Sequence, residues 1–236
     1  MPKRSTSPLA GVLLICLVLA LVLFRYFHRS NPQINCGEHC GTERWLIKTL
    51  ADPESRKIDW NPRSSTIPDL VGLEAPRVLD DSRAQAETRV YSVEAILVGW
   101  KAETGTHGDR DYHLVLADPG EPQRTLIAEV PSGDCAGACS SSHVQQFLET
   151  RQELMNRLSA PQAHFRRLKP AWLVKVQGVG FFDIYHNQIG VAENCIELHP
   201  VLHIEFLREL GPETDLPQRI EPPAEHRCGR LGGENF

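Results

Sequence analysis

Apolar and polar positions follow three different patterns along the chain. Residues 9–24 form one uninterrupted run without a charged side chain. Residues 31–87 hold short apolar clusters broken by prolines, which forbid a long helix or a central strand. From residue 88 onward apolar and polar positions alternate in β-branched and aromatic-rich segments, the pattern of β-strands. The sequence therefore predicts a membrane segment, an irregular wrap and a mainly β domain.

Five strands and one helix are predicted in the β-rich part. The strands are expected at residues 90–101, 112–117, 125–130, 172–183 and 195–206, and the helix at residues 140–158. The helix has an apolar stripe at helical spacing, and Ser142 with Gln145 suggests a capping box at its start. A helix between the third and fourth of five strands is the chain order of the OB fold. The predicted fold class is mainly β with one helix, an OB-like five-stranded barrel behind an N-terminal transmembrane helix.

These patterns divide the chain into four parts. They are a signal anchor or transmembrane segment at 1–30, a proline-rich wrap with Cys36 and Cys40 at 31–87, the OB-like β-barrel domain at 88–207, and a flexible C-terminal tail at 208–236. Within the wrap, residues 45–50 are expected to form a short strand or a helical turn laid on the body.

The N-terminal apolar run admits two interpretations. Its sixteen residues span about 24 Å as a helix, and residues 9–27 are expected to contact the membrane. A cleaved signal peptide is one interpretation, with Lys3 and Arg4 as the basic start. An uncleaved anchor is favoured, because the run is followed by bulky and charged residues rather than by a small-residue cleavage site.

Charge is unevenly distributed. The net charge of the chain is −5. Lys3, Arg4, Arg25 and Arg29 give the first thirty residues +4, which leaves −9 for the body. An acidic body argues against coating nucleic acid, since that needs a basic face. Nucleic acid is therefore an unlikely partner.

The cysteine count indicates an oxidising compartment. Of seven cysteines, Cys16 lies in the apolar run, and six remain in the body. An even number behind an export signal is typical of disulfides. The six disulfide candidates are Cys36, Cys40, Cys135, Cys139, Cys195 and Cys228.

The cysteine spacing favours two local bridges. Two Cys-x3-Cys pairs predict Cys36–Cys40 and Cys135–Cys139, which leaves Cys195–Cys228. Free structural thiols are one alternative. A zinc site that uses Cys36, His39 and Cys40 is another, although the usual zinc-knuckle spacing is Cys-x2-Cys.

Four short segments stand out together: KTLAD at 48–52, RDYHLVL at 110–116, GVGFFD at 178–183 and IELHPV at 196–201. In combination they resemble a family of uncharacterised bacterial exported proteins with an OB-like domain. The resemblance covers residues 43–206. It implies a bacterial origin and export, and it implies no activity.

Imidazoles and carboxylates gather near predicted strand ends. The metal-ligand candidates are Asp111, His113, Asp183, His186 and His199. These residue types suit a borderline divalent metal with an open position for water, and such a water can attack a phosphodiester or ester. The competing interpretation is a polar network that only stabilises the strands. The chain has no His-Glu-x-x-His, Gly-x-Ser-x-Gly, Walker or dinucleotide motif.

Two functional hypotheses follow. The leading hypothesis is a membrane-anchored exocytoplasmic binding module without catalysis, whose partner is an envelope protein or a small ligand; it needs no cofactor. The alternative is a metal-assisted hydrolase of the phosphodiesterase or nuclease type, which needs a divalent metal at the strand-end histidines and aspartates. Both hypotheses expect a single-pass membrane protein with its body outside the cytoplasm, periplasmic or extracellular.

Overall fold

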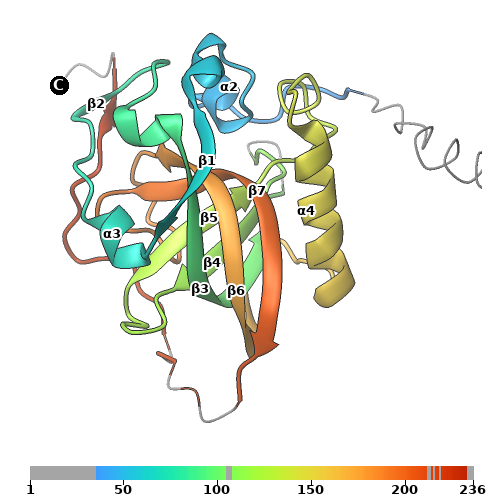
Figure 1. Cartoon of the computed structure of the whole chain (residues 1–236), viewed down its shortest axis with the longest axis vertical. Coiled ribbons are helices and arrows are strands. Elements are labelled where there is room, and N and C mark those ends of the chain that lie inside the picture. Colours follow the sequence, from blue (N-terminus) through green and yellow to red (C-terminus); the bar gives the residue numbers. More distant parts are fainter. Residues whose placement is uncertain (1–35, 105–107, 212–213, 215, 218, 233–236) are drawn as a thin grey trace, which may run out of the picture. The chain divides into compact units, whose positions relative to one another are not determined.

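The computed structural model describes residues 36–104, 108–211, 214, 216–217 and 219–232. The fold is mainly β with one main helix (Figure 1). The strands are β1 (Asp59–Ser65), β2 (Val78–Leu79), β3 (Arg89–Ala102), β4 (Tyr112–Ala117), β5 (Thr125–Val130), β6 (Arg166–Phe182), β7 (Ile196–Glu209) and β8 (Arg230–Leu231). The helices are α2 (Trp45–Lys48), α3 (Ile67–Val71) and α4 (Val144–Arg157), with 3-10 turns at Pro53–Lys57 and Gln85–Thr88.

Six strands form one sheet in the order β1-β3-β4-β5-β7-β6, and β6 also pairs with β3. Neighbours are antiparallel except for β5 with β7 and β1 with β3, which are parallel. The path β3, β4, β5, β7, β6 therefore returns to β3. β1 adds to β3 at the margin, and most of its residues are exposed (Figure 1).

Local sequence pattern located the short strands well and the long ones less well. β4 and β5 have the predicted bounds. β6 begins at Arg166, six residues before the predicted start, because Arg166 and Arg167 pair with Trp100 and Gly99 of β3. The segment is polar and exposed on one side, so its pattern does not indicate a strand; backbone pairing decides it.

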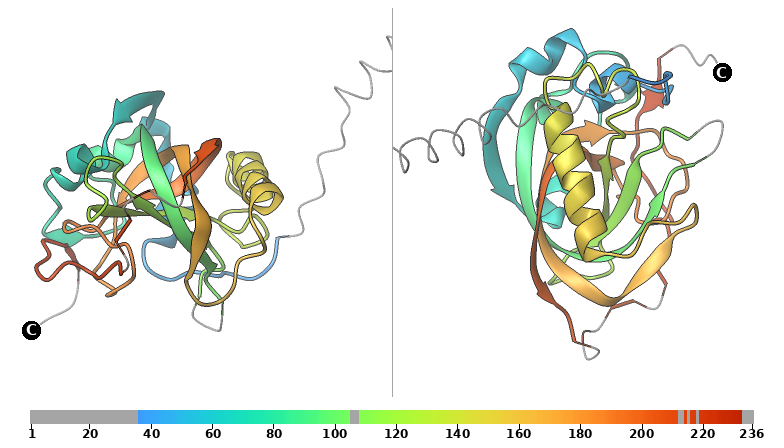
Figure 2. Two further views of the ribbon diagram at one scale, coloured as in Figure 1. Left: turned by 90° about the horizontal axis from the view of Figure 1, so that it is seen from below. Right: turned by 90° about the vertical axis from the view of Figure 1, so that its right-hand side faces the viewer.

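The helix α4 packs along β7 through Phe147 and Leu154, and Thr150 Oγ1 donates to the carbonyl of Leu202 at 3.0 Å (Figure 2). The predicted capping box from Ser142 is wrong. His143 occupies the N-cap position and its side chain makes no cap hydrogen bond. Ser141 instead accepts a hydrogen bond from the backbone N–H of His143.

The two faces of the sheet differ in chemistry. The main core cluster lies on one face and includes Leu114 and Leu116 of β4 and Leu126 and Ala128 of β5. Because side chains alternate along a strand, the intervening residues of β4 and β5 face the other way. Residues 183–195 cover part of that second face, where Val191 and Cys195 pack on Ile127 and the carbonyl of Ile189 contacts His113.

Three disulfides fasten the wrap and the C-terminal segment to the sheet: Cys36–Cys139, Cys40–Cys135 and Cys195–Cys228. The predicted local bridges Cys36–Cys40 and Cys135–Cys139 are wrong, whereas Cys195–Cys228 is confirmed. Three disulfides are typical of a protein of an oxidising, extracytoplasmic compartment.

The two Cys-x3-Cys segments pair with each other because they lie side by side. Gly37 donates to the carbonyl of Asp134, and Ala136 donates to the carbonyl of Glu38. Trp45 Nε1 donates to the carbonyl of Ala136 at 2.7 Å. Gly137, at φ 94°, leaves the space that this indole fills, since a Cβ there would lie 2.6 Å from Nε1. We call this double bridge the disulfide clasp.

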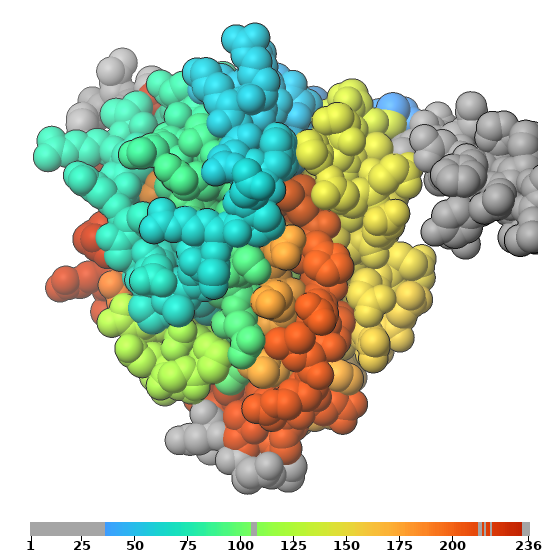
Figure 3. Space-filling model, viewed as in Figure 1, coloured from blue at the N-terminus to red at the C-terminus, as the bar shows by residue number. Residues whose placement is uncertain are grey.

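The segment after β7 is held at several points. β7 itself runs to Glu209, Leu210 is buried, and β8 pairs with β2 in parallel. The predicted flexible tail thus contains a strand and a disulfide at Cys228 in its described part. On the face shown in Figure 3, the surface is formed by the wrap in blue to cyan, by β6 and β7 in orange and by α4 in yellow.

The predicted membrane segment at residues 1–30 lies outside the described residues. Among the residues that the structure does describe, no helix is long and apolar enough to cross a membrane.

Candidate metal centre

The second face of β4, β5 and β7 carries a cluster of buried ionisable side chains. His113 of β4 lies directly opposite Glu129 of β5 in the antiparallel register. Glu197 of β7 lies beside Ile127 of β5 in the parallel register, and His199 follows two residues later. Strand alternation directs all four to the same face. Each side chain is at most 4% exposed.

Asp111, Glu129 and His199 form the first group that could hold a cation. One ligand atom from each lies within 4.8 Å of the others. His199 Nε2 is 3.0 Å from Asp111 Oδ2, and His199 Nδ1 is 3.2 Å from Glu129 Oε2. A cation about 2.0–2.2 Å from each ligand holds the ligand atoms roughly 3.0–3.5 Å apart. Each of these two nitrogen–oxygen distances matches a pair of ligand atoms, and because they involve opposite nitrogens of one ring, a single cation can use one of the two pairs.

The polar atoms of this group are close together and yet do not satisfy one another. Within the described part of the chain, both ring nitrogens of His199, Asp111 Oδ2 and Glu197 Oε2 are buried without a hydrogen-bond partner. The contacts of His199 with Asp111 and Glu129 are ion-pair contacts at 3.0 and 3.2 Å. The other oxygen of Asp111 accepts from the backbone N–H of Ser132, which orients Oδ2 toward His199. Buried groups in this state need a further partner.

Glu103, His113 and Glu129 form the second group. His113 Nδ1 is 2.8 Å from Glu129 Oε1 and 3.6 Å from Glu103 Oε1. His113 Nε2 is 3.1 Å from the carbonyl oxygen of Ile189. A carbonyl only accepts, so Nε2 carries the proton. Glu129 thus presents one oxygen to each group.

A lysine and two more carboxyls complete the cluster. Lys48 Nζ, from α2 of the wrap, is 3.4 Å from Asp183 Oδ2 and 3.8 Å from Asp109 Oδ2. Burial alone would lower the pKa of Lys48, but the negative charges of Asp183 and Glu129 raise it above its usual range. Lys48 is therefore a fixed positive charge.

Carboxyl groups outnumber cationic groups in this cluster, and the pKa values of three of the carboxyl groups are raised as a result. Burial, reinforced by the charges of Asp111 and Glu129, raises the pKa of Asp109 to about 8. Burial also raises the pKa of Asp111, and burial with the charge of Glu129 raises that of Glu197 well above its usual range. Burial opposes ionisation of Glu129 too, but contacts with both histidines hold its pKa well below the usual value.

The histidines respond in the opposite sense. Burial would lower both pKa values, but the neighbouring carboxylates raise that of His113 to about 9 and that of His199 to about 10. Without a metal, protons are the cations that occupy this site. Imidazole nitrogens and carboxylate oxygens are also the ligands that borderline divalent metals accept.

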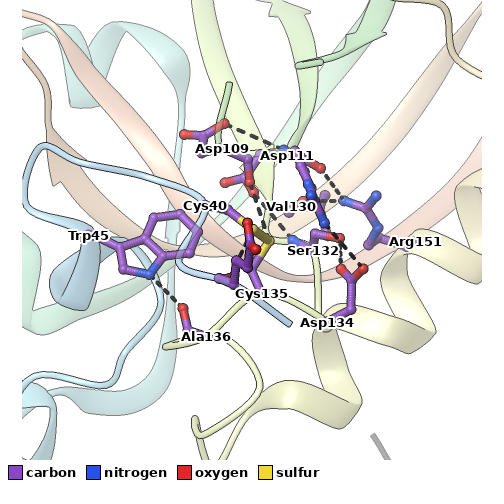
Figure 4. The surroundings of a disulfide bond; sticks show 12 residues. Cys40, Trp45, Asp109, Asp111, Val130, Ser132, Asp134, Cys135, Ala136 and Arg151 are labelled. Atoms are coloured by element: carbon purple, nitrogen blue, oxygen red, sulfur yellow. Dashed lines mark hydrogen bonds and ion pairs between the residues drawn. A yellow bond between two sulfur atoms is a disulfide. The ribbon is translucent and has the colours of Figure 1, made fainter. Parts of the chain in front are cut away.

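A groove of about 710 Å³ reaches the cluster at Glu103. Its lining also includes Cys40 of the disulfide clasp, Ser132, Arg110 and Arg151. Figure 4 shows Asp109 and Asp111 close to the Cys40–Cys135 bridge, with Asp111 bonded to Ser132. The clasp therefore borders both the groove and the candidate centre.

The structure brings three of the five sequence-predicted ligands together. Asp111, His113 and His199 converge on Glu129. Asp183 binds Lys48 instead. The side chain of His186 is 33% exposed, lies 3.8 Å from Asp183 and belongs to neither group.

Pattern reasoning missed Glu129, Glu103, Asp109 and Lys48. Glu129 left one signal: it is the single acid in β5, a strand whose six residues are all buried. An acid in such a strand needs a partner. Glu103 and Lys48 left no such signal in the sequence. Glu103 follows the end of a strand, and Lys48 comes from the wrap.

Comparison of the chain with protein-family models, with curated proteins and with solved structures gives no match. Its function has to be inferred from the side chains of the site.

Proposed function

We propose that this protein is an exported binding module whose ligand is a divalent transition-metal cation, held by His199 and Glu129, with Asp111 as the second contact of the imidazole. The observation that supports the proposal is the set of buried ligand atoms without hydrogen-bond partners, at the spacing of paired ligand atoms. A cation on His199 Nδ1 would satisfy that nitrogen and contact Glu129 Oε2, and Nε2 would keep its proton on the side of Asp111 Oδ2. Glu197 Oε2, 4.0 Å from His199 Nδ1, is the nearest further oxygen donor.

The ligand set favours zinc or manganese over calcium or magnesium. Calcium and magnesium take shells of oxygen atoms, whereas a shell with imidazole is typical of zinc and its neighbours. Neutral His199 has one lone pair and one N–H, so one carboxylate can share the cation while the other accepts the proton. That is the usual second contact of a metal-bound histidine.

The setting that we propose is an OB-like barrel on a membrane anchor. The closed pairing path of β3, β4, β5, β7 and β6, with α4 between β5 and β6, supports the barrel. The disulfides and the apolar run at residues 9–24 support a single-pass protein with its body outside the cytoplasm. Membership of the family of bacterial exported proteins stays a prediction.

Elemental analysis of the full chain tests the cation. The protein is purified with its disulfides intact and without a metal-affinity step, stripped with chelator, and dialysed against zinc or manganese. We expect at least one equivalent per chain, which His199→Gln removes. His203→Gln is the matched control, because His203 is exposed on the same strand. A wild-type chain that retains no cation would contradict the proposal.

The groove favours a second candidate function, a metal-assisted hydrolase. Arg110 and Arg151 line it together with Glu103, and guanidinium groups beside a cation suit the oxygens of a phosphoester. Water would supply the oxygen that bonds to phosphorus as the ester P–O bond breaks. The leaving alkoxide takes one proton of that water, and the other is released.

A chromogenic phosphodiester tests this candidate. If cation-loaded protein hydrolyses it, His199→Gln should lower the rate by about 100-fold or more, since ligand loss costs at least as much as the loss of a supporting contact. His186→Gln should leave the rate unchanged, because His186 lies outside both groups. If the cation-loaded protein does not hydrolyse the phosphodiester, the hydrolase candidate is wrong and the binding module remains.

A further inference from the structure

Glu129 is placed to serve two cations. Its Oε2 faces His199 at 3.2 Å, and its Oε1 faces His113 at 2.8 Å. The two groups share this residue and no other. A carboxylate that presents one oxygen to each of two ligand sets is the bridging element of two-metal sites, whose ions lie about 3.5–4 Å apart.

His113 has its lone pair on the correct nitrogen for the second position. Its Nε2–H donates to the carbonyl of Ile189 at 3.1 Å. In the neutral ring this leaves the lone pair on Nδ1, facing Glu129 and Glu103. Two acceptors at 2.8 Å repel unless a cation or a proton lies between them. The backbone carbonyl therefore holds the ring in the tautomer that a metal ligand needs.

Charge balance points to more than one divalent cation. The cluster contains six carboxyl groups and two lysines, Lys48 and Lys101, or four negative charges with all acids ionised and both histidines neutral; Lys101 Nζ lies 2.7 Å from Glu103 Oε1. The six carboxyl groups are those of Glu103, Asp109, Asp111, Glu129, Asp183 and Glu197. One divalent cation leaves two negative charges, and two leave none. Buried charge is costly unless compensated.

The two positions differ in their access to solvent. Asp111 and His199 are 0% exposed, whereas the side chain of Glu103 is 16% exposed and lines the groove. Arg110 is half-exposed beside the same groove. Its φ of 63° is strained for a side chain other than glycine. Asp109 and Asp111 on either side of it both contact the cluster.

We propose that Glu103, His113 and Glu129 hold a second divalent cation, which shares Glu129 with the first and takes a phosphoryl-type anion from the groove. The inference rests on the proposed cation site and deepens it. The inner cation is closed off and the outer one is reachable. The anion bridges the outer cation and the guanidinium of Arg110.

Cation stoichiometry of the full, oxidised chain tests the second position. Wild type should bind two equivalents of manganese, with the spin coupling of a bridged pair in its electron paramagnetic resonance spectrum. Glu103→Gln should bind one equivalent and lose the coupling. Glu38→Gln should keep two, because Glu38 lines the same groove and belongs to neither group. Circular dichroism checks that each variant is folded.

The outcomes separate the two proposals. One equivalent in wild type, unchanged in Glu103→Gln, overturns the second cation and leaves the first. No bound cation in wild type overturns both.

Inorganic phosphate is the probe for the anion. It should bind to the fully loaded protein, and Glu103→Gln or Arg110→Gln should weaken it at least tenfold. Equal phosphate binding by loaded Glu103→Gln would overturn the assignment of the groove ligand to the outer cation.

Discussion

Two buried ionic clusters involve residues of the N-terminal wrap, and they are built on opposite principles. In the arginine network, Arg44 donates to both oxygens of Glu87 through Nη1 and Nη2, and Arg83 donates to both oxygens of Asp52 through Nε and Nη2. In the candidate metal centre, Glu129 and its neighbours crowd around two histidines. The wrap supplies all four residues of the arginine network and Lys48 of the candidate metal centre.

The arginine network is satisfied within itself. Arg44 also donates to the carbonyls of Asp80, Ser82 and Phe182, and Glu87 accepts from the backbone N–H groups of Ala84 and Phe182. Two cations meet two anions, and no side-chain atom of the four residues is among the buried unpartnered ones of the described chain. Such a network fastens the wrap to β6 and has no need of a ligand.

The candidate metal centre has surplus acid and buried atoms without hydrogen-bond partners. The four buried unpartnered side-chain atoms of the described residues all belong to it. In the arginine network, by contrast, donors and acceptors match in number. The unmatched charges of the candidate metal centre are the ones that a bound cation could compensate.

The largest expected effect comes from breaking the satisfied network. Glu87→Gln leaves Arg44 buried with an uncompensated charge, and should lower the free energy of unfolding by about 3–5 kcal/mol. Urea titration followed by fluorescence measures it, with and without zinc. The loss should be similar in both conditions.

Glu94→Gln is the control for that change, since Glu94 is exposed on β3 and should shift stability by less than about 0.5 kcal/mol. If Glu87→Gln proved neutral, the view of the arginine network as a structural clamp would be wrong.

The next largest effect is the loss of stabilisation by the cation. At a free cation concentration 100 times Kd, binding to the folded state adds about 2.7 kcal/mol. Glu129→Gln removes the ligand shared by both groups, so zinc or manganese should no longer raise its Tm. Differential scanning calorimetry with and without the cation checks this. If zinc or manganese raised the Tm of Glu129→Gln as much as that of wild type, the cation would bind at another site.

Stabilisation by the cation should depend on pH in the opposite direction to the stability of the metal-free protein. Contacts with Asp111 and Glu129 raise the pKa of His199 from 6.5 to about 10 against the opposing effect of burial. Its contribution to metal-free stability is therefore complete below about pH 6.5, and disappears as the pH rises through about 10.

The cation competes with that proton. Below the pKa of His199 each unit of pH should cost up to about 1.4 kcal/mol of stabilisation by the cation. Unfolding curves at pH 6, 7 and 8, with and without zinc, measure both trends. Protection that stays constant over this range would argue against a histidine ligand.

The smallest effect should have the reverse sign of the first. Burial and the charge of Glu129 raise the pKa of Glu197, so the ionised side chain destabilises the metal-free fold. Glu197→Gln should stabilise metal-free protein by about 1 kcal/mol at pH 8, and should weaken cation binding. Glu205→Gln, exposed on the same strand, is the control. Destabilisation by Glu197→Gln would remove the contrast between the two clusters.

The local sequence pattern was sufficient to predict the bounds of a strand where burial and backbone pairing agree. β4 and β5 carry apolar residues throughout, and their bounds follow from the sequence. It failed at Arg166, where pairing with β3 overrides a polar segment. It also failed at the start of α4, where Ser141 rather than Ser142 makes the side-chain contact.

The cysteines show the same limit at longer range. The sequence indicates disulfides because of their even number, but spacing favours the nearest partner. Cys36 and Cys139 are 103 residues apart and Cys40 and Cys135 are 95 apart. Their pairing depends on how the wrap crosses the sheet, which no local pattern contains.

By itself the sequence determined the strand-rich class, the position of the long helix and the candidate ligands Asp111, His113 and His199, because alternation and residue type are local properties. Only the tertiary structure decided that Glu129 joins them, that Lys48 occupies Asp183, and that His186 stays outside. Strand register and the path of the wrap set these distances. Both arise from burying one face of the sheet against distant segments, so the candidate metal centre depends on the tertiary fold.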